Sequence, residues 1–268
     1  MDPADLYYAF RNVVGDEAYA LAFCLTLRMI SRFPADSTDP TPRQDRTTWH
    51  RAEEEVLNCD LFGPDSAIGP TAINFNNPHD TPQKRGAYAI VAVGIMSELI
   101  RHGDHAPEQV IAPTASDIHF HAMMDLPLPF CPYAPAAMAT WHLPKMTSPH
   151  FLEDGEWMGV YSYGLGLRMP ISWDPPMRGI HFTTRRDPEF PKLVFLKGSG
   201  SDRVGPFDVE GCVSDEDGLC DMSKIYGPHL MWHWQTFMTP FGLVGTWGKD
   251  GWGGWVWLWK ASWQPGQA

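Results

Sequence analysis

The stretch "GPFDVEGCVSDEDGLCDMSKIY" (205–226) decides the fold, because polar and apolar residues alternate along both of its halves with a period of two. In the first half, Asp208 and Glu210 alternate with Phe207 and Val209. Successive side chains of a β-strand point to opposite faces of a sheet. We therefore predict two strands whose acidic residues face solvent and whose apolar residues face the interior.

The second half of this stretch places a lysine on the interior face. Asp221 and Ser223 alternate with Met222, Lys224 and Tyr226. An ammonium group in an apolar interior is costly unless it has a partner. Lys224 therefore either lies at a rim with its charged end in water, or it has a buried partner and a role.

Short stretches of the same kind, separated by Gly, Pro and Asp, continue on both sides of residues 205–226. Consecutive strands with short links favour an antiparallel up-and-down barrel. Eight strands are also the number at which a barrel can enclose one small ligand. The predicted strands span residues 156–164, 179–185, 192–200, 205–213, 219–226, 230–237, 241–248 and 253–260.

The first part of the chain has a different pattern. Helices are predicted over residues 16–33, 46–62 and about 83–102, and residues 106–150 are rich in Pro, Met and His. Such a density of proline excludes long regular elements and is typical of a connecting segment. The predicted fold class is α+β, mainly β: residues 1–150 form a helical region with a Pro-rich connection, and residues 151–268 form an eight-stranded antiparallel barrel on which the helices pack.

Composition limits the classes of partner. The 268 residues contain 20 Lys and Arg against 32 Asp and Glu, a formal net charge of −12, which repels a phosphate backbone or an anionic membrane surface. The five cysteines are scattered, which is typical of reduced thiols. The apolar runs 18–27 and 86–96 are too short to cross a bilayer. We expect a cytoplasmic protein that binds no nucleic acid and does not insert into a membrane.

The region from residue 195 to residue 260 resembles the β-module of fungal F-box-associated proteins and lipocalin-like barrels. Its pattern is a G-S-G turn, G-P-F-x-[IV]-x-G, a K-x-Y strand, a following His, G-T-W and an aromatic closing strand, and "WMGVY" (157–161) is similar to the W-x-G-x-Y that opens such barrels. The residues that carry the resemblance are Gly198, Ser199, Gly200, Gly205, Pro206, Phe207, Val209, Gly211, Lys224, Tyr226, His229, Gly245, Thr246, Trp247, Leu258 and Trp259.

The resemblance implies which side chains of residues 230–237 face inward, and it bears on two functions, a protein-binding adaptor and a cyclase. It implies that Met231 and His233 point into the barrel and that Trp232 and Trp234 point outward. The N-terminal region shows no L-P-x-E-[IL] helical hairpin of the F-box type, so docking to a ubiquitin-ligase scaffold is not expected. Similar barrels with a helical partner include cofactor-independent cyclases that direct intramolecular Diels–Alder reactions.

No nucleophile motif, nucleotide loop or strong metal motif occurs in the sequence. His119 and His121 would share one face of a strand, with Asp117 or Asp125 as a third ligand, but a polar turn in a Pro-rich segment is the favoured interpretation. A reaction within one bound molecule needs neither metal nor cofactor, only a shaped site and a hydrogen-bond donor. We predict no cofactor and no metal.

The candidate site is taken from the expected interior of the barrel. Candidate catalytic donors are Tyr226, His233 and Lys224, and candidate substrate-binding walls are Trp157, Tyr161, Tyr163, Phe207, Met222, Met231 and Trp247. The same aromatic residues would equally form an ordinary filled core.

The closing stretch "GWGGWVWLWK" (251–260) has tryptophan at every second position. If Val256 and Leu258 face inward, then Trp255, Trp257 and Trp259 form an apolar outer patch that a soluble protein rarely exposes. We expect the N-terminal helices, or the second subunit of a homodimer, to cover it.

Three functions follow as hypotheses. The first is a cofactor-independent cyclase or isomerase of fungal secondary metabolism that folds an apolar polyketide or terpenoid for an intramolecular [4+2] cyclisation. The alternatives are an F-box-associated type of adaptor that binds protein and a non-catalytic carrier of hydrophobic small molecules. An enzyme or carrier that encloses its ligand needs a hollow lumen, whereas an adaptor can have a filled barrel.

Overall fold

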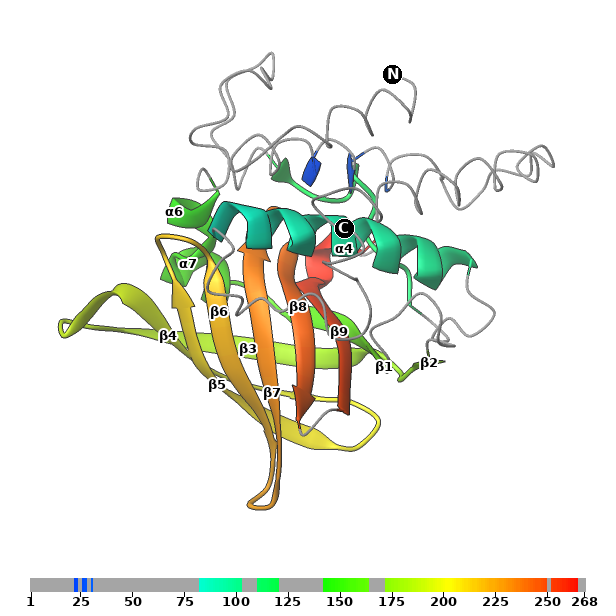
Figure 1. Cartoon of the computed structure of the whole chain (residues 1–268). Helices are drawn as coiled ribbons and strands as arrows, with labels where there is room; N and C mark the ends of the chain where they lie inside the picture. The colour runs from blue at the N-terminus through cyan, green and yellow to red at the C-terminus, as the bar shows by residue number, and fades with distance from the viewer. Residues whose placement is uncertain are drawn as a thin grey trace, which may run out of the picture.

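The computed structural model describes residues 22, 23, 26, 27, 30, 82–102, 110–120, 142–163, 172–249 and 252–264. Most of them belong to one antiparallel sheet that closes on itself (Figure 1). The barrel order is β1-β3-β4-β5-β6-β7-β8-β9, and β1 pairs with β9 to complete the ring. The strands are β1 (Trp157–Tyr163), β2 (Ser172–Trp173), β3 (Met177–Asp187), β4 (Phe190–Ser201), β5 (Pro206–Ser214), β6 (Leu219–Tyr226), β7 (Leu230–Thr239), β8 (Gly242–Lys249) and β9 (Trp252–Lys260).

All eight predicted strands are confirmed, with bounds that differ by at most two residues. The eight-stranded antiparallel barrel, which matches a lipocalin-like architecture, is therefore confirmed as well. The two-residue strand β2 was not predicted, and it pairs with the end of β1 beside the barrel.

The register shows which side chains face inward. Val209 of β5 lies opposite Lys224 of β6, and Lys224 lies opposite Trp232 of β7. Residues directly opposite each other in an antiparallel pair share one face. The acidic residues Asp208 and Glu210 are therefore on the outer face, as predicted from the alternation.

The orientation of β7 corrects a prediction. Trp232 and Trp234 face inward, because they lie opposite Lys224 and Met222. Met231 and His233 point outward instead, with 46% of Met231 and 44% of the His233 side chain exposed. Both residues were expected inside on the basis of the resemblance, and that expectation is wrong.

The interior of the barrel is packed with side chains. Ten of the side chains that face inward have 5% or less of their surface exposed, which leaves almost no surface for a water molecule to contact. The barrel is thus filled among the residues that the structure describes. These side chains are Trp157, Phe182, Leu196, Phe207, Val209, Met222, Trp234, Trp247, Val256 and Leu258.

Two short helices close one end of the barrel. They are α6 (Leu143–Met146) and α7 (Pro149–Glu153), and each has a proline in its first turn, where a missing N–H costs nothing. The Trp157 indole donates to the carbonyl of Leu152 across 2.9 Å, which attaches α7 to β1. His142, fully buried before α6, contacts the carbonyl oxygen of Met238 at 2.8 Å through its Nε2.

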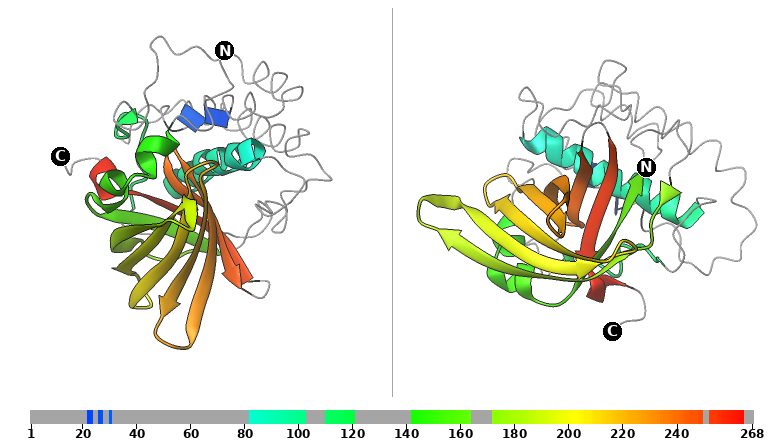
Figure 2. Two further views of the ribbon diagram at one scale, coloured as in Figure 1. Left: turned by 90° about the vertical axis from the view of Figure 1, so that its left-hand side faces the viewer. Right: turned by 90° about the horizontal axis from the view of Figure 1, so that it is seen from below.

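The helix α4 (Pro82–His102) lies across the outer side of β7 and β8 (Figure 2). It confirms the predicted helix that begins at about residue 83. Of the predicted helix 16–33, the described residues are helical, and Thr26 donates to the carbonyl of Ile90 in α4. The predicted helix 46–62 lies outside the described residues. No described helix combines the length and hydropathy needed to cross a membrane.

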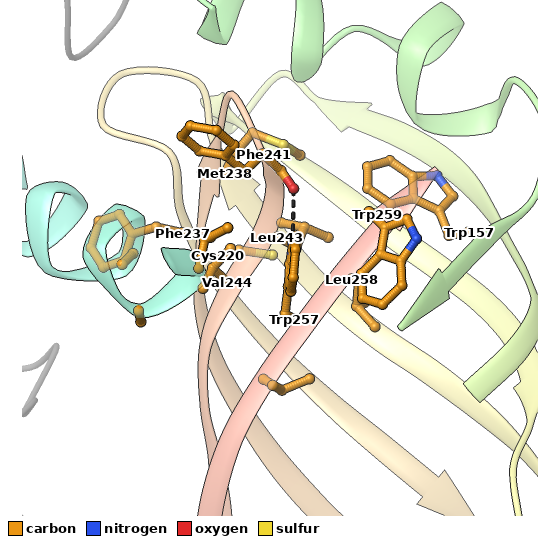
Figure 3. Close-up of a cluster of buried hydrophobic side chains, with 14 of the residues drawn as sticks. Trp157, Cys220, Phe237, Met238, Phe241, Leu243, Val244, Trp257, Leu258 and Trp259 are labelled. Atoms are coloured by element: carbon orange, nitrogen blue, oxygen red, sulfur yellow. Dashed lines mark hydrogen bonds between the residues drawn. The ribbon is translucent and has the colours of Figure 1, made fainter. Parts of the chain in front are cut away.

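The tryptophans of β9 lie on the outer face, as predicted, and they are covered. Val256 and Leu258 face inward, whereas Trp255, Trp257 and Trp259 face outward with 6%, 0% and 0% of their surfaces exposed. The indole of Trp257 donates to the carbonyl of Phe241 across 2.9 Å (Figure 3).

Candidate functional site

A cluster of polar groups occupies the end of the barrel opposite to α6 and α7. We call this end the mouth; the loops 202–205, between β4 and β5, and 227–229, between β6 and β7, surround it. Lys224 extends from β6 and forms an ion pair with Asp202 of the first loop. The side chains of the two residues are 3% and 0% exposed, so the pair is buried.

Aromatic rings enclose the ammonium group of Lys224. Its Nζ lies 4.2 Å from the ring centroid of Phe207, 4.6 Å from that of Tyr161, 5.0 Å from that of Tyr226 and 5.6 Å from that of Trp234. These distances are within the range of cation–π attraction. The prediction that a buried Lys224 needs a partner is therefore confirmed, and the alternative of a rim position is excluded.

The backbone of its own loop orients Asp202. The Oδ1 atom accepts hydrogen bonds from the amides of Val204, at 2.9 Å, and Gly205, at 3.3 Å. Gly205 has a φ of 138°, a value that favours glycine, so the sequence "DRVG" can fold back onto the aspartate. With Oδ1 engaged by the loop, Oδ2 points into the barrel, where it accepts from Lys224 and from the hydroxyl of Tyr226.

A chain of hydrogen bonds continues from Asp202 to a second carboxylate. The hydroxyl of Tyr161 lies 3.2 Å from Oδ2 of Asp202 and 2.7 Å from Oδ2 of Asp174. Asp174 also accepts from the hydroxyl of Tyr163 at 2.7 Å, and the exposed guanidinium of Arg203 lies 3.5 Å from its other oxygen. The mouth therefore contains two carboxylates, three phenols and a buried ammonium in one connected cluster.

The charges of the cluster follow from burial and hydrogen bonding. Burial lowers the pKa of Lys224 to about 8, against the raising effect of Asp202. Burial alone would raise the pKa of Asp202, but the hydrogen bonds from Lys224 and Tyr226 outweigh it and lower that pKa. At pH 7 the two groups therefore form an ion pair.

The phenols of the cluster are neutral at pH 7. Burial, together with the hydrogen bond to Asp174, raises the pKa of Tyr163 to about 12. Burial and the adjacent carboxylates also raise the pKa values of Tyr161 and Tyr226. Each of the three hydroxyls therefore keeps its proton and can donate it in a hydrogen bond.

Rings of the mouth are edge-on to one another. Trp247 lies 5.3 Å, between ring centroids, from each of Tyr161, Tyr163 and Trp232. Its indole N–H donates to the carbonyl of Ser162 across 2.9 Å, which fixes β8 against β1. Tyr163 and Trp232 are half-buried, so this aromatic surface is accessible from the mouth.

The structure gathers some of the predicted site residues and separates others. Lys224, Tyr226, Tyr161, Tyr163, Phe207 and Trp247 come together at the mouth, whereas Met222 lies in the filled interior. Trp157 lies at the other end, near α7, and Met231 and His233 lie on the outer surface. The sequence reasoning missed Asp202, Asp174, Trp232 and Trp234 as members of this cluster.

The described residues contain no group of three or more His, Cys, Asp or Glu side chains arranged to hold a metal ion. Asp117 instead accepts from the backbone and the hydroxyl of Thr114, at 2.8 and 2.6 Å, as in a polar turn. His121 and Asp125, the other parts of the weighed metal site, lie outside the described residues.

Comparison with known proteins found no match for this chain among protein-family models, curated proteins or solved structures.

Proposed function

We propose that this protein is a cofactor-independent cyclase or isomerase whose apolar substrate, a polyketide or terpenoid, binds at the mouth of the barrel. The observation that supports the proposal is the juxtaposition of neutral phenol donors with half-buried aromatic rings. Tyr163, Tyr226 and Trp232 are each half-buried at the mouth. The hydroxyl of Tyr163 donates to Asp174, and that of Tyr226 donates to Asp202.

This geometry suits a reaction that reorganises bonds within one molecule. Aromatic rings provide apolar contact area for the hydrocarbon part of a substrate. A phenol that turns from its carboxylate to a carbonyl oxygen of the substrate would lower the energy of a transition state that gathers negative charge there. Because the barrel is filled, we place the substrate site at the mouth, whereas the sequence predicts it inside the barrel or at a helical lid.

A second candidate is favoured by the same filled interior. An adaptor that binds protein through its barrel loops needs no lumen, and Val204 and Leu230, in and beside the two loops of the mouth, are 59% and 39% exposed. A carrier that encloses its ligand within the barrel is disfavoured, because the described interior side chains leave no room for one.

The test is a search for isomerisation, which changes the retention time of a compound but not its mass. The purified chain is incubated with extracts rich in linear polyenes and terpenoids, and products are followed by liquid chromatography and mass spectrometry. We expect a product of unchanged mass, formed at least about tenfold more slowly by Tyr226→Phe, which lacks the phenol. Glu210→Gln, a change on the outer face of the neighbouring strand, is the matched control and should keep full activity.

A result with no isomeric product and a protein that co-purifies through the mouth loops would reject the cyclase and support the adaptor. Equal losses of activity in Tyr226→Phe and Glu210→Gln would show that the effect is not specific to the mouth.

A further inference from the structure

The ammonium group of Lys224 has a complete shell of neighbours. Besides Asp202 and the four rings, it lies 3.4 Å from the sulfur of Met177. No direction is left from which the carbonyl carbon of a substrate could approach the nitrogen. Lys224 is thus poorly placed to act as a nucleophile, although burial depresses its pKa.

The same shell has the chemistry of a cation-binding site. Aromatic cages with a carboxylate are used by proteins to bind alkylammonium groups of ligands. Phe207, Tyr161, Tyr226 and Trp234 with Asp202 form such a cage, and the chain fills it with its own side chain.

We propose that the barrel contains an alkylammonium-binding cage, occupied by Lys224, and that Lys224 is a positioning residue for the phenols of the mouth. The ammonium keeps the buried Asp202 ionised, and the ionised Oδ2 is the acceptor that orients the hydroxyl of Tyr226. The same oxygen lies 3.2 Å from the hydroxyl of Tyr161, which donates to Asp174 across 2.7 Å. Without the cation, a carboxylate with no exposed surface takes up a proton and becomes a donor itself. Tyr226 then loses its acceptor and reorients, and Tyr161 loses the negative charge beside its hydroxyl.

This inference deepens the proposed function, and only its catalytic consequence rests on that function. The cage can be tested without any substrate, so its failure and the failure of the cyclase proposal are distinguishable.

The test is chemical rescue of Lys224→Ala by n-propylammonium. The substitution removes Cγ, Cδ, Cε and Nζ, which are the heavy atoms of n-propylammonium, so this ion can fill the space that the side chain leaves. Removing one partner of a buried ion pair lowers the thermal midpoint by about 10 °C in a protein of this size. Millimolar n-propylammonium should restore most of that loss, whereas neutral 1-propanol should not.

The positioning of the phenols has its own readout. The ¹³C signals of tyrosine Cζ, assigned with Tyr226→Phe and Tyr161→Phe, should move in Lys224→Ala and return when n-propylammonium is added. Lys260→Ala is the matched control, because Lys260 is also buried and also lies over rings, those of Phe151 and Trp157. The Lys260→Ala variant should have a lower thermal midpoint but an unmoved Tyr226 signal, since the Nζ of Lys260 donates to the backbone carbonyl of Asp154 and not to a group of the mouth.

Equal rescue by 1-propanol would overturn the cage, because the site would then require volume and not charge. Absence of rescue by either compound would overturn it as well, because the space left by the side chain would then not bind an alkylammonium ion. If Lys224→Ala does not fold, Lys224→Gln provides the test, since it keeps a donor near Asp202 but removes the charge. Unmoved Tyr226 and Tyr161 signals in that variant would overturn the positioning role.

Discussion

The stability of the closed end should depend on pH through a single histidine. His142 is fully buried beside α6, and its Nε2 lies 2.8 Å from the carbonyl oxygen of Met238. Burial lowers its pKa from 6.5 to about 4, against the raising effect of that carbonyl. The folded state therefore contains the neutral imidazole, with the proton on Nε2.

The sign and size of the effect follow from linkage. Between pH 4 and 6.5 the unfolded state binds more protons at this residue than the folded state, so stability rises with pH across that window. The full difference of 2.5 pH units corresponds to about 3 kcal/mol. Between pH 7 and pH 5 the two titration curves give a loss of about 2 kcal/mol that His142 alone contributes.

The assay is urea unfolding at pH 7 and pH 5 of the wild type and of His142→Gln, whose side-chain amide can still donate to Met238. Because all other titratable groups are common to both proteins, only the difference between their pH dependences reports on His142. We expect the free energy of unfolding to fall by about 2 kcal/mol more in the wild type. The same pH dependence in both proteins would refute a buried neutral histidine at this position.

Two further predictions concern the closing strand. Trp257→Phe should destabilise the fold by about 1 kcal/mol more than Trp259→Phe, as measured by urea unfolding, because the Trp257 indole donates to Phe241, whereas the Trp259 indole has no hydrogen-bond partner among the described residues. Equal costs would contradict a role for this hydrogen bond. Gly254→Ala should prevent closure of β1 onto β9, because its Cβ would lie 1.7 Å from the carbonyl oxygen of Ser162. Circular dichroism should show an unfolded or rearranged chain, and a native spectrum with an unchanged thermal midpoint would contradict this packing.

The positions of the strands were predictable because they rest on local signals. Each strand alternates with a period of two, and Gly, Pro or Asp separates it from the next. Strand β6 has the bounds that the alternation predicts, 219–226. Among the described strands, β2 alone was not predicted, since two residues are too few to show a period.

The prediction of which β7 side chains face inward was wrong, although the length of the β6–β7 loop indicates the correct ones. Both sets of side chains in "LMWHWQTF" are bulky, so the alternation alone does not distinguish inside from outside. A loop of three residues, 227–229, places Tyr226 opposite Leu230, and counting back along both strands places Lys224 opposite Trp232. Since Lys224 was already assigned to the interior, the loop length should have outweighed the resemblance.

Large side chains fit inside the barrel because glycines lie beside them on the neighbouring strands. Gly198 and Gly211 lie on the inner face, and a Cβ on them would approach Phe182 to 2.7 Å and Met222 to 2.8 Å. Large and small residues therefore complement each other between neighbouring strands. Such complementarity determines whether a barrel is hollow or filled, and it depends on the three-dimensional register, which a single strand cannot reveal.

The carboxylates of the mouth were missed for a related reason. Asp202 follows a G-S-G-S stretch at a turn, where an aspartate usually serves its own backbone. It does so here through Oδ1, while Oδ2 points into the barrel. The pairing of β4, β5 and β6 brings Lys224 to that oxygen. The signal that could have located Asp202 is the need of an interior lysine for an acid in an adjacent loop.

A comparison of two buried lysines, Lys260 and Lys224, shows that the mouth contains more polar groups than the burial of a lysine requires. Lys260, at the closed end, has a lowered pKa of about 8 from burial, and its ammonium donates to one backbone carbonyl over two rings. That arrangement suffices to bury an ammonium in this barrel. Lys224 instead engages the carboxylate of Asp202, which also accepts from the phenol of Tyr226 and lies 3.2 Å from the phenol of Tyr161, and Tyr161 donates to a second carboxylate, that of Asp174. Burying Lys224 requires none of these additional groups, so their gathering at the mouth supports a chemical role for this end of the barrel.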